Sequence, residues 1–324
     1  MEHDMKHVLF ATAALFATAN VAVADVKFSG FARFGIGYQE DRSADDNIDD
    51  TILISRFRLN IDGDAETDNG IKFSARVRLQ ADEDSDTGEA EQAGLNGARF
   101  SVIYGGLRVD AGNVAGSFDN SDLYFGTEPG LEEFLGQYSG VDYDFLEYDS
   151  TGAGSNAVFF QYDVGDFAFS ASYDADAEEG ADRWDIGVIY SIDNISATVL
   201  YGKTDGVNGE SGQDLVVLAL GAEFGDFGGT VLVGRDGDTP DNDFGEETDG
   251  TTYGLSLAYN IGVATTLTAA YGDGSAEGDT QQYGIGFIHD LGGGASLQGA
   301  VGREKVGREG DGQVLADFGV RFNF

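Results

Sequence analysis

The sequence predicts an all-β protein, a 16-stranded antiparallel transmembrane β-barrel with a long third loop folded into the lumen. Strand-like segments, in which apolar and polar residues alternate, recur from residue 26 to the last residue of the 324-residue chain. The breaks between them are alternately long and short, as expected when the two ends of a barrel face different compartments. The chain has only two prolines, a residue that removes a ladder hydrogen bond from a sheet.

The N-terminus is expected to be a signal peptide and not part of the fold. Lys6 precedes an apolar stretch, and "AVA" directly before Asp25 matches a small-x-small cleavage site. The alternative, a membrane anchor helix, fits less well because the apolar run is short. Residues 1–24 are therefore predicted to be removed, and residues 25–324 to form one exported barrel domain.

Five strands are expected before the longest break, at residues 26–38, 51–62, 70–80, 97–104 and 107–113. Their two faces differ in chemistry, because alternate side chains of a strand leave on opposite sides. In "TILISRFRLNID", Leu53, Phe57 and Leu59 lie on one face. Arg56 and Arg58 lie on the other face. The break at 105–106 is a two-glycine turn, whereas the breaks at 39–50 and 81–96 are long and acidic.

Six further strands are expected at 155–163, 166–173, 183–191, 195–203, 213–224 and 227–235. In the third of these, Trp184, Ile186 and Val188 alternate with small or polar neighbours. The strand at 213–224 is less clear, because "LVVLALGAEF" is apolar on both faces. The short break "GD" at 225–226 suits a hairpin turn.

The last five strands are expected at 250–260, 263–272, 280–289, 295–303 and 313–324, after an acidic loop at 236–249. The final strand places Val314, Phe318 and Phe322 on one face, and Asp317 and Arg321 on the other. Small residues (Gly, Ser, Ala and Thr) dominate the polar faces of the later strands. We interpret them as the lining of a wide, unselective pore.

A soluble β-sandwich would also contain strands with one apolar and one polar face. The even strand count and the alternating loop lengths favour the barrel. Tyrosines near the strand ends favour it too, since aromatic girdles mark the membrane interfaces. These are Tyr38, Tyr104, Tyr173, Tyr190, Tyr201, Tyr259 and Tyr271.

Composition excludes several other classes of protein. The chain has no cysteine, so disulfides and thiolate metal sites are impossible. Only His289 remains as a histidine outside residues 1–24, and the motifs GxSxG, HExxH and the P-loop are missing, so we expect no enzyme. The net charge of −40 disfavours nucleic-acid binding. No apolar run after the signal is long enough for a transmembrane helix.

Basic residues gather on the polar faces of the first five strands and are predicted to form one wall of a pore constriction. The members of this wall are Arg33, Arg56, Arg58, Lys72, Arg76, Arg78, Arg99 and Arg108. The break at 114–154 is too long for a plain connection, and we expect it to fold into the barrel. Its acids Asp119, Asp122, Glu128, Glu132 and Glu133 would then face the wall and create a transverse field. The alternative is a cluster of surface salt bridges.

Five stretches carry a family resemblance: "GFARFGIGYQEDR" (30–42), "SRFRLNIDGDAETDNGIKFSARVRLQ" (55–80), "GGLRVDAGNV" (105–114), "SFDNSDLYF" (117–125) and "ADFGVRFNF" (316–324). Together they resemble the sixteen-stranded general-diffusion porins of Gram-negative outer membranes, in particular the Rhodobacter-type group. The matches cover both ends of the chain and the start of the third loop.

The resemblance implies a homotrimer in the outer membrane, in contact with lipid and lipopolysaccharide. Each protomer would be a water-filled pore for passive diffusion of ions and small hydrophilic solutes, narrowed by its third loop. In that family, basic residues of the early strands face acids of this loop. Positions Arg33, Arg56, Arg58, Arg76 and Arg78 match the basic set, and Asp119 and Asp122 fall in the start of the loop.

No cofactor is required for this activity, although the acidic loops are expected to collect calcium, which members of the family bind near the third loop. "DGDTPDNDFGEETD" has closely spaced carboxylates but lacks the order of an EF-hand. Two other functions stay open at this point. One is a substrate-selective channel, and the other is an acidic exported β-rich adhesin or binding protein.

Overall fold

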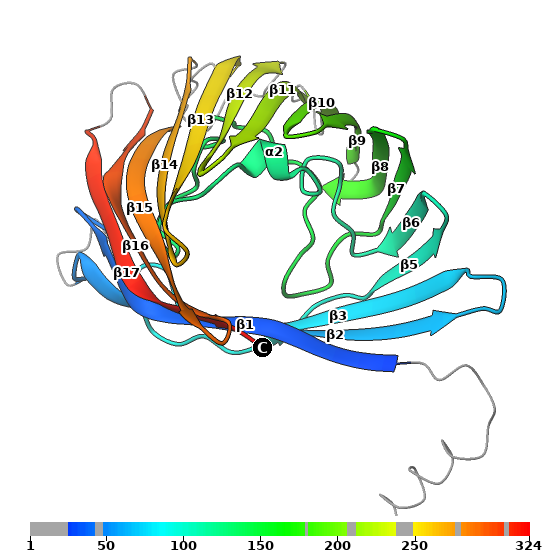
Figure 1. Ribbon diagram of the computed structural model, residues 1–324, viewed down its shortest axis with the longest axis horizontal. Coiled ribbons are helices and arrows are strands. Elements are labelled where there is room, and N and C mark those ends of the chain that lie inside the picture. Colours follow the sequence, from blue (N-terminus) through cyan, green and yellow to red (C-terminus); the bar gives the residue numbers. More distant parts are fainter. Residues whose placement is uncertain are drawn as a thin grey trace, which may run out of the picture.

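The computed structural model is a closed antiparallel barrel (Figure 1). The structure describes residues 25–42, 48–178, 181–205, 212–237, 249–275, 280–307 and 311–324, so the predicted signal peptide at 1–24 and most of the loop at 236–249 lie outside the described residues. The described strands are β1 (Asp25–Gln39), β2 (Thr51–Glu66), β3 (Lys72–Asp82), β4 (Gly94–Leu95), β5 (Arg99–Tyr104), β6 (Leu107–Gly112), β7 (Ala157–Val164), β8 (Phe167–Glu178), β9 (Ala181–Ile192), β10 (Ile195–Thr204), β11 (Gln213–Phe224), β12 (Phe227–Gly237), β13 (Gly250–Ile261), β14 (Thr265–Gly274), β15 (Thr280–Gly292), β16 (Ala295–Val306) and β17 (Gln313–Asn323).

The barrel closes because the last strand pairs with the first. β17 lies antiparallel to β1, with Arg33 opposite Arg321 and Ile36 opposite Phe318. Every other long strand pairs with its neighbours in chain order, and β3 pairs with both β4 and β5. A sheet that closes on itself is a barrel and not a sandwich, so the alternative of a two-sheet fold is wrong.

The predicted set of sixteen strands is confirmed, with ends that differ by a few residues. The two-residue β4 is additional: it falls in the break predicted at 81–96, where Leu95 pairs with Leu79. The short helix α2 (Asp122–Phe125) was also not predicted. Elements of two to four residues are too short to show a hydrophobic period. No helix in the described part of the chain is long and apolar enough to span a membrane.

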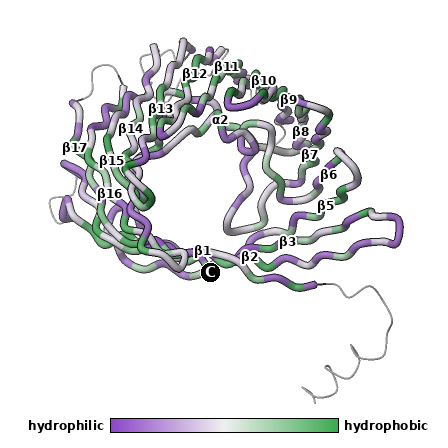
Figure 2. The backbone as a smooth tube through the Cα atoms, in the orientation of Figure 1, coloured by the Kyte–Doolittle hydropathy of each residue, from purple (hydrophilic) through white to green (hydrophobic). Residues whose placement is uncertain are grey.

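The outer face of the barrel is apolar and the inner face is mostly polar. Large apolar side chains such as Leu53 and Ile285 are 71% and 65% exposed on the isolated protomer. Figure 2 shows hydrophobic and hydrophilic residues alternating along many of the strands. Apolar side chains exposed around a whole barrel are stable in lipid and not in water. The strands are therefore membrane-spanning.

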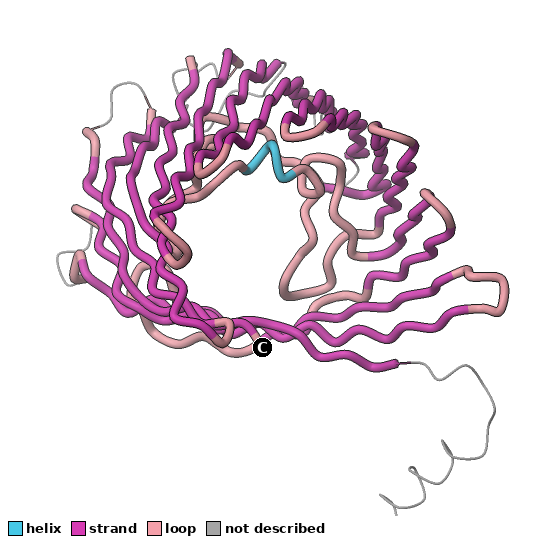
Figure 3. Tube along the Cα trace, viewed as in Figure 1, coloured by secondary structure: helices cyan, strands magenta, loops and turns pink. Residues whose placement is uncertain are grey.

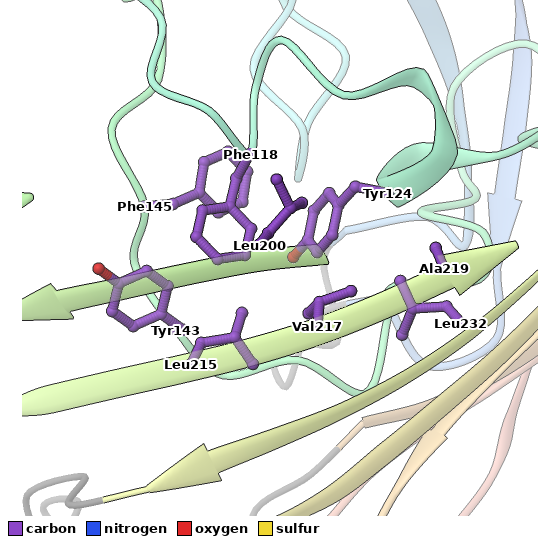
Figure 4. Close-up of a cluster of buried hydrophobic side chains, with 9 residues drawn as sticks. All are labelled: Phe118, Tyr124, Tyr143, Phe145, Leu200, Leu215, Val217, Ala219 and Leu232. Carbon is purple, nitrogen blue, oxygen red and sulfur yellow. The ribbon is translucent and has the colours of Figure 1, made fainter. Parts of the chain in front are cut away.

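The segment 113–156, between β6 and β7, lies inside the ring of strands, as predicted (Figure 3). We call it the constriction loop. Its aromatic side chains pack against the inner face of β10, β11 and β12, where α2 also makes contact (Figure 4). The cluster consists of Phe118, Tyr124, Tyr143 and Phe145 of the loop, and Leu200, Leu215, Val217, Ala219 and Leu232 of the wall. Burying one such side chain contributes roughly 1.5–3 kcal/mol.

This packing explains the strand at 213–224, which looked apolar on both faces. One face of β11 meets lipid, with Leu218 half exposed. The other face, with Leu215 and Val217, is fully buried under the constriction loop. The same reason applies to "TILI" in β2, where Ile52 and Ile54 are buried against Leu131 of the loop.

Wall side chains also hold the backbone of the constriction loop by hydrogen bonds. The carboxylate of Asp317 in β17 accepts from the amides of Leu131, Glu132 and Glu133 at 2.8, 2.8 and 3.0 Å. The amide oxygen of Gln282 in β15 accepts from Leu135 and Gly136 at 2.7 and 3.2 Å. In β9, Asp185 accepts from the amide of Ser117 at 2.8 Å. These three acceptors are all buried.

Glycines of the wall leave room for the loop. The ring of Phe134 lies against Gly284 in β15 and Gly302 in β16, and an added Cβ at either glycine would come within 2.6 Å of a ring carbon. The interpretation of small residues on the later strands as the lining of a wide pore is therefore wrong for these positions. They are small because the constriction loop covers them.

Replacement of Asp317 by alanine is expected to loosen the constriction loop, because it leaves three backbone amides without an acceptor. Each unsatisfied buried donor costs about 1–3 kcal/mol. We expect a lower unfolding temperature in detergent and a larger, noisier single-channel conductance. The matched control is Asp226→Ala, at the exposed turn between β11 and β12. Equal behaviour of the two variants would show that Asp317 does not hold the loop.

Candidate pore constriction

Among the predicted acids of the loop, Glu132 is the one that pairs directly with arginines of the basic wall. Its carboxylate pairs with the guanidinium groups of Arg33 in β1 and Arg56 in β2, the latter at 3.2 Å. Arg33 also donates a hydrogen bond to the carbonyl of Leu131 at 2.9 Å. Arg56 has a second acidic partner, Asp82, on the facing position of β3. Three of the predicted residues thus come together here, with the acid inserted between two bases.

Two more arginines, one on each of the strands that flank β1, lie against the aromatic ring of Phe31 in β1. The guanidinium carbon of Arg321 in β17 is 4.1 Å from the ring centroid of Phe31, and that of Arg58 in β2 is 5.2 Å away. Both distances are within the range of cation–π attraction. Arg58 also donates to Ser150 of the loop at 3.3 Å. Phe31 therefore keeps two like charges apart inside the lumen.

A second loop contact joins β3 and β5. The ring of Tyr148 lies under Arg78 and Arg99, with centroid distances of 4.6 and 5.2 Å. Arg78 donates to Ser150 at 2.8 Å. The carboxylate of Asp119 accepts from the amide of Tyr148 at 3.0 Å. Asp119 therefore lies behind Tyr148, near the basic wall but without a direct ion pair to it among the described contacts.

The environment of Asp119 changes its acidity. Burial raises the pKa of Asp119 above its ordinary value, and the amide of Tyr148 and the charges of Arg78 and Arg99 oppose this shift. A raised pKa means that the group becomes neutral at a less acidic pH than an ordinary aspartate.

The other predicted bases lie farther along the wall, where strand acids and not loop acids are their partners. Arg76 binds Asp62 through two hydrogen bonds of 2.6 and 3.0 Å. Lys72 is 3.4 Å from Asp64. Arg108 donates to Asp110 at 3.0 Å, and Arg99 is 4.0 Å from the same carboxylate. Arg108 also reaches Asn120 of the loop, at 3.4 Å.

The remaining predicted acids occupy three different places. Glu133 pairs with Arg42, just after β1, at 3.0 Å. Glu128 is exposed and accepts a hydrogen bond from the hydroxyl of Tyr138 at 3.0 Å. Asp122 is exposed at the start of α2, which contacts β10, β11 and β12 on the far side of the barrel from the basic wall (Figure 1). The structure therefore does not bring Asp122 to the arginines.

Arg33, Arg56, Arg321, Glu128, Glu132 and Tyr138 line one cavity of about 680 Å³ between wall and loop. We call this region the constriction. Two of its members, Arg321 and Tyr138, were not predicted as site residues. A signal for Arg321 existed, because it lies on the polar face of the last strand and closure of the barrel places it opposite Arg33. Tyr138 gave no such signal in the sequence.

The calcium prediction is not tested by the structure. Within the described ranges, no group of three or more histidine, aspartate or glutamate side chains is arranged to hold a metal ion. The predicted acidic loop at 236–249 is described only at its ends. Calcium binding therefore stays a prediction.

Comparisons with known proteins agree with this geometry. Residues 11–308 match the family model of Gram-negative porins. The chain is 30% identical over 312 residues to a porin of Fuscovulum blasticum and 28% identical over 326 residues to a porin of Rhodobacter capsulatus, covering 93% of this chain and 100% of each relative.

Solved structures give the same result. Two mutants of the Rhodopseudomonas blastica porin superpose with TM-scores of 0.75 and 0.76, each at 28% identity, over 93% of this chain and 100% of theirs. Sequence and overall fold thus agree along nearly the whole length of the chain. The chain belongs to the family of Gram-negative porins.

Proposed function

We propose that the constriction sets which solutes pass this porin. The family and the barrel identify the chain as a channel of the outer membrane for passive diffusion, and they point to a channel rather than an enzyme. The observation that supports a charged filter is the insertion of Glu132 between Arg33 and Arg56. These charged groups, one acid between two bases, lie at the edge of the water-filled space and create a local electric field in it.

Such a field favours polar solutes over apolar ones. Water molecules and solute dipoles align with it, so an apolar solute displaces ordered water without compensation. Small ions and hydrophilic molecules keep their hydration while they cross. The acidic loops give the chain a net charge of −40, which raises the local concentration of cations. We infer a channel for ions and small hydrophilic solutes with modest cation preference.

The double substitution Arg58→Gln/Arg78→Gln is expected to increase this cation preference. Among the described contacts these two arginines bind Gln80, Asn60 and Ser150, so their removal leaves no carboxylate unpaired. We expect the ratio of potassium to chloride permeability to rise roughly two- to threefold. Reversal potentials of planar bilayers in a potassium chloride gradient measure it.

The matched control for that experiment is Lys203→Gln/Lys305→Gln, which removes the same charge near the ends of β10 and β16 that lead into long loops. The control should change the permeability ratio much less. If both double variants give the same reversal potential, Arg58 and Arg78 do not contribute to the ion selectivity of the pore. Loss of all channel steps would instead contradict the diffusion function itself.

We also propose a homotrimer, with the short strands as the interface. β5 and β6 have six residues each, whereas a transmembrane strand needs about 9–11 residues. Their outer side chains include Phe100, Val102 and Tyr104, all exposed on the isolated protomer. Strands too short to cross the bilayer are stable when a second copy of the chain, and not lipid, packs against their outer face.

Val102→Asn, on the outer face of β5, is therefore expected to convert the trimer to monomers in unheated detergent gels. Val231→Asn, on the outer face of β12, places the same polar group against lipid and should leave the trimer band in place. Both valines are similarly exposed on the protomer, at 40% and 46%. Equal loss of the trimer in the two variants would contradict this interface.

We further propose that the chain is exported by its signal peptide and that calcium links its acidic loops to lipopolysaccharide. The predicted signal peptide at residues 1–24 would direct the chain out of the cytoplasm. Divalent cations bound weakly by the long acidic loops would bridge these loops to anionic lipopolysaccharide. We expect calorimetric titration with calcium to reveal several weak sites, and chelation to release bound lipopolysaccharide. A titration without heat beyond dilution would contradict the calcium part.

A further inference from the structure

The constriction contains one base and one acid that no ion pair engages. Five charged side chains line its cavity: Arg33, Arg56, Arg321, Glu128 and Glu132. Glu132 pairs with both Arg33 and Arg56, and Arg56 also pairs with Asp82 of β3. Within the described ranges, Arg321 and Glu128 have no ion pair at all. One guanidinium and one carboxylate of the cavity are therefore left open to a solute.

The charged groups just outside the cavity are bound to other partners. Glu133 pairs with Arg42 at 3.0 Å, and the buried Glu83 accepts a hydrogen bond from a backbone amide of β2 at 2.6 Å. Asp317 accepts from backbone amides of the constriction loop. Arg58 donates to side chains of a glutamine and a serine. None of these acids forms an ion pair with Arg321, and none of these bases forms one with Glu128.

The guanidinium of Arg321 is held in place while its donors stay unused. Its central carbon lies 4.1 Å from the ring centroid of Phe31, and the side chain is half-buried. Its guanidinium makes no hydrogen bond within the part of the chain that the structure describes. A guanidinium has five N–H donors in a fork that matches the two oxygens of a carboxylate. Arg321 is thus prepared to bind the carboxylate of a solute.

The carboxylate of Glu128 is held in a comparable way on the side of the loop. The hydroxyl of Tyr138 donates to one of its oxygens, Oε1, at 3.0 Å, and the side chain is exposed. The next residue is Pro129, which restricts the backbone of Glu128 to extended conformations. The second oxygen has no partner among the described contacts. An ammonium group, with three donors, suits such an acceptor.

The two open groups belong to different parts of the structure and share one cavity. Arg321 comes from β17 of the wall and Glu128 from the constriction loop. The cavity of about 680 Å³ lies in the size range of small-molecule sites, roughly 300–1,000 Å³. Phe134, Leu135 and Ile288 give it an apolar part. A solute with opposite charges and a short neutral or apolar portion matches this lining.

We propose that the constriction binds small zwitterions, solutes that carry both an ammonium and a carboxylate group, such as amino acids with neutral side chains. The carboxylate binds Arg321 and the ammonium binds Glu128. A solute with one charge finds only one of these partners, and a neutral solute finds neither. This proposal rests on the proposed diffusion function and names a class of solute for the same constriction.

The test measures initial uptake of four solutes of equal size into liposomes that contain the trimeric protein. Alanine is the zwitterion, lactate the anion, alaninamide the cation and lactamide the neutral member of the set. The pH is 6.5, below the ordinary pKa of an α-amino group. Equal potassium chloride on both sides holds the membrane potential at zero. We expect alanine to enter at least about threefold faster than lactamide from dilute solution, and to saturate in the millimolar range, as for weak binding by charge-assisted hydrogen bonds.

Two single variants locate the site. Arg321→Gln and Glu128→Gln should each lower the alanine-to-lactamide ratio to about that of an unselective pore and remove saturation. A zwitterion has no net charge, so a mere change in the average potential of the pore would alter this ratio little. An unchanged ratio in either variant would overturn the proposal.

The matched controls remove the same charges elsewhere. Arg303→Gln changes an exposed side chain near the end of β16, and Asp122→Asn changes an exposed acid of the loop on the far side from the arginines. Both should leave the alanine-to-lactamide ratio as it is. A loss of the ratio in the controls as large as in the two site variants would also overturn the proposal.

A further arm varies the distance between the two charges. 4-Aminobutyrate is compared with its neutral partner 4-hydroxybutyramide in the same liposomes. Saturating uptake of alanine, of 4-aminobutyrate or of both supports the site and defines the charge separation that it accepts. Linear uptake of both zwitterions at the rates of their neutral partners would overturn it. Lactamide uptake reports the open pore separately, so failure of the zwitterion site does not resemble failure of the diffusion function.

Discussion

The constriction depends on the attachment of one loop to the inside of the barrel. A long segment in a water-filled lumen loses conformational entropy when it becomes ordered, so it needs compensating contacts. Two kinds of contact provide them: aromatic side chains on an apolar sector of the wall, and backbone amides bound to Asp317, Gln282 and Asp185. The backbone amide of Glu132 is itself bound by Asp317, so the anchoring of the loop also fixes the acid that meets the arginines.

The basic wall also contains acidic and amide side chains. Strands β2, β3 and β6 carry acids or amides on the same face as their basic residues, and register pairs some of them across strands, as with Arg76 and Asp62. This arrangement lowers the repulsion between neighbouring cations, which a wall of bases alone would suffer. It also divides the wall into two regions. Near the loop, arginines share acids of the loop and rings such as Phe31 and Tyr148. Toward the short turns, they share acids of the strands.

Much of this could be predicted from the sequence, because the period of a strand is two residues whatever its tertiary surroundings. That period alone defined the barrel strands and placed the bases on the lumen side. It could not say which bases meet the loop, since this depends on where an irregular segment crosses the pore. Two predicted residues show this limit. Asp122 is an acid of the loop, but it belongs to α2, which packs on the wall opposite the arginines. Lys72 is a base on the lumen face, but it lies near the turn and pairs with the strand acid Asp64. Arg321 could be assigned to the constriction only if the last strand was known to pair with the first, which places it opposite Arg33.

The apolar inner face of β11 has a consequence for biogenesis. With the loop in place, Leu215, Val217 and Ala219 are fully buried; without it these three side chains would face the water of the lumen. If the barrel closed before the loop docked, a row of apolar side chains would be exposed in the water-filled lumen. Such an apolar surface favours local dewetting and the binding of apolar segments of other proteins. We therefore expect docking of the loop and closure of this part of the wall to be coupled during assembly.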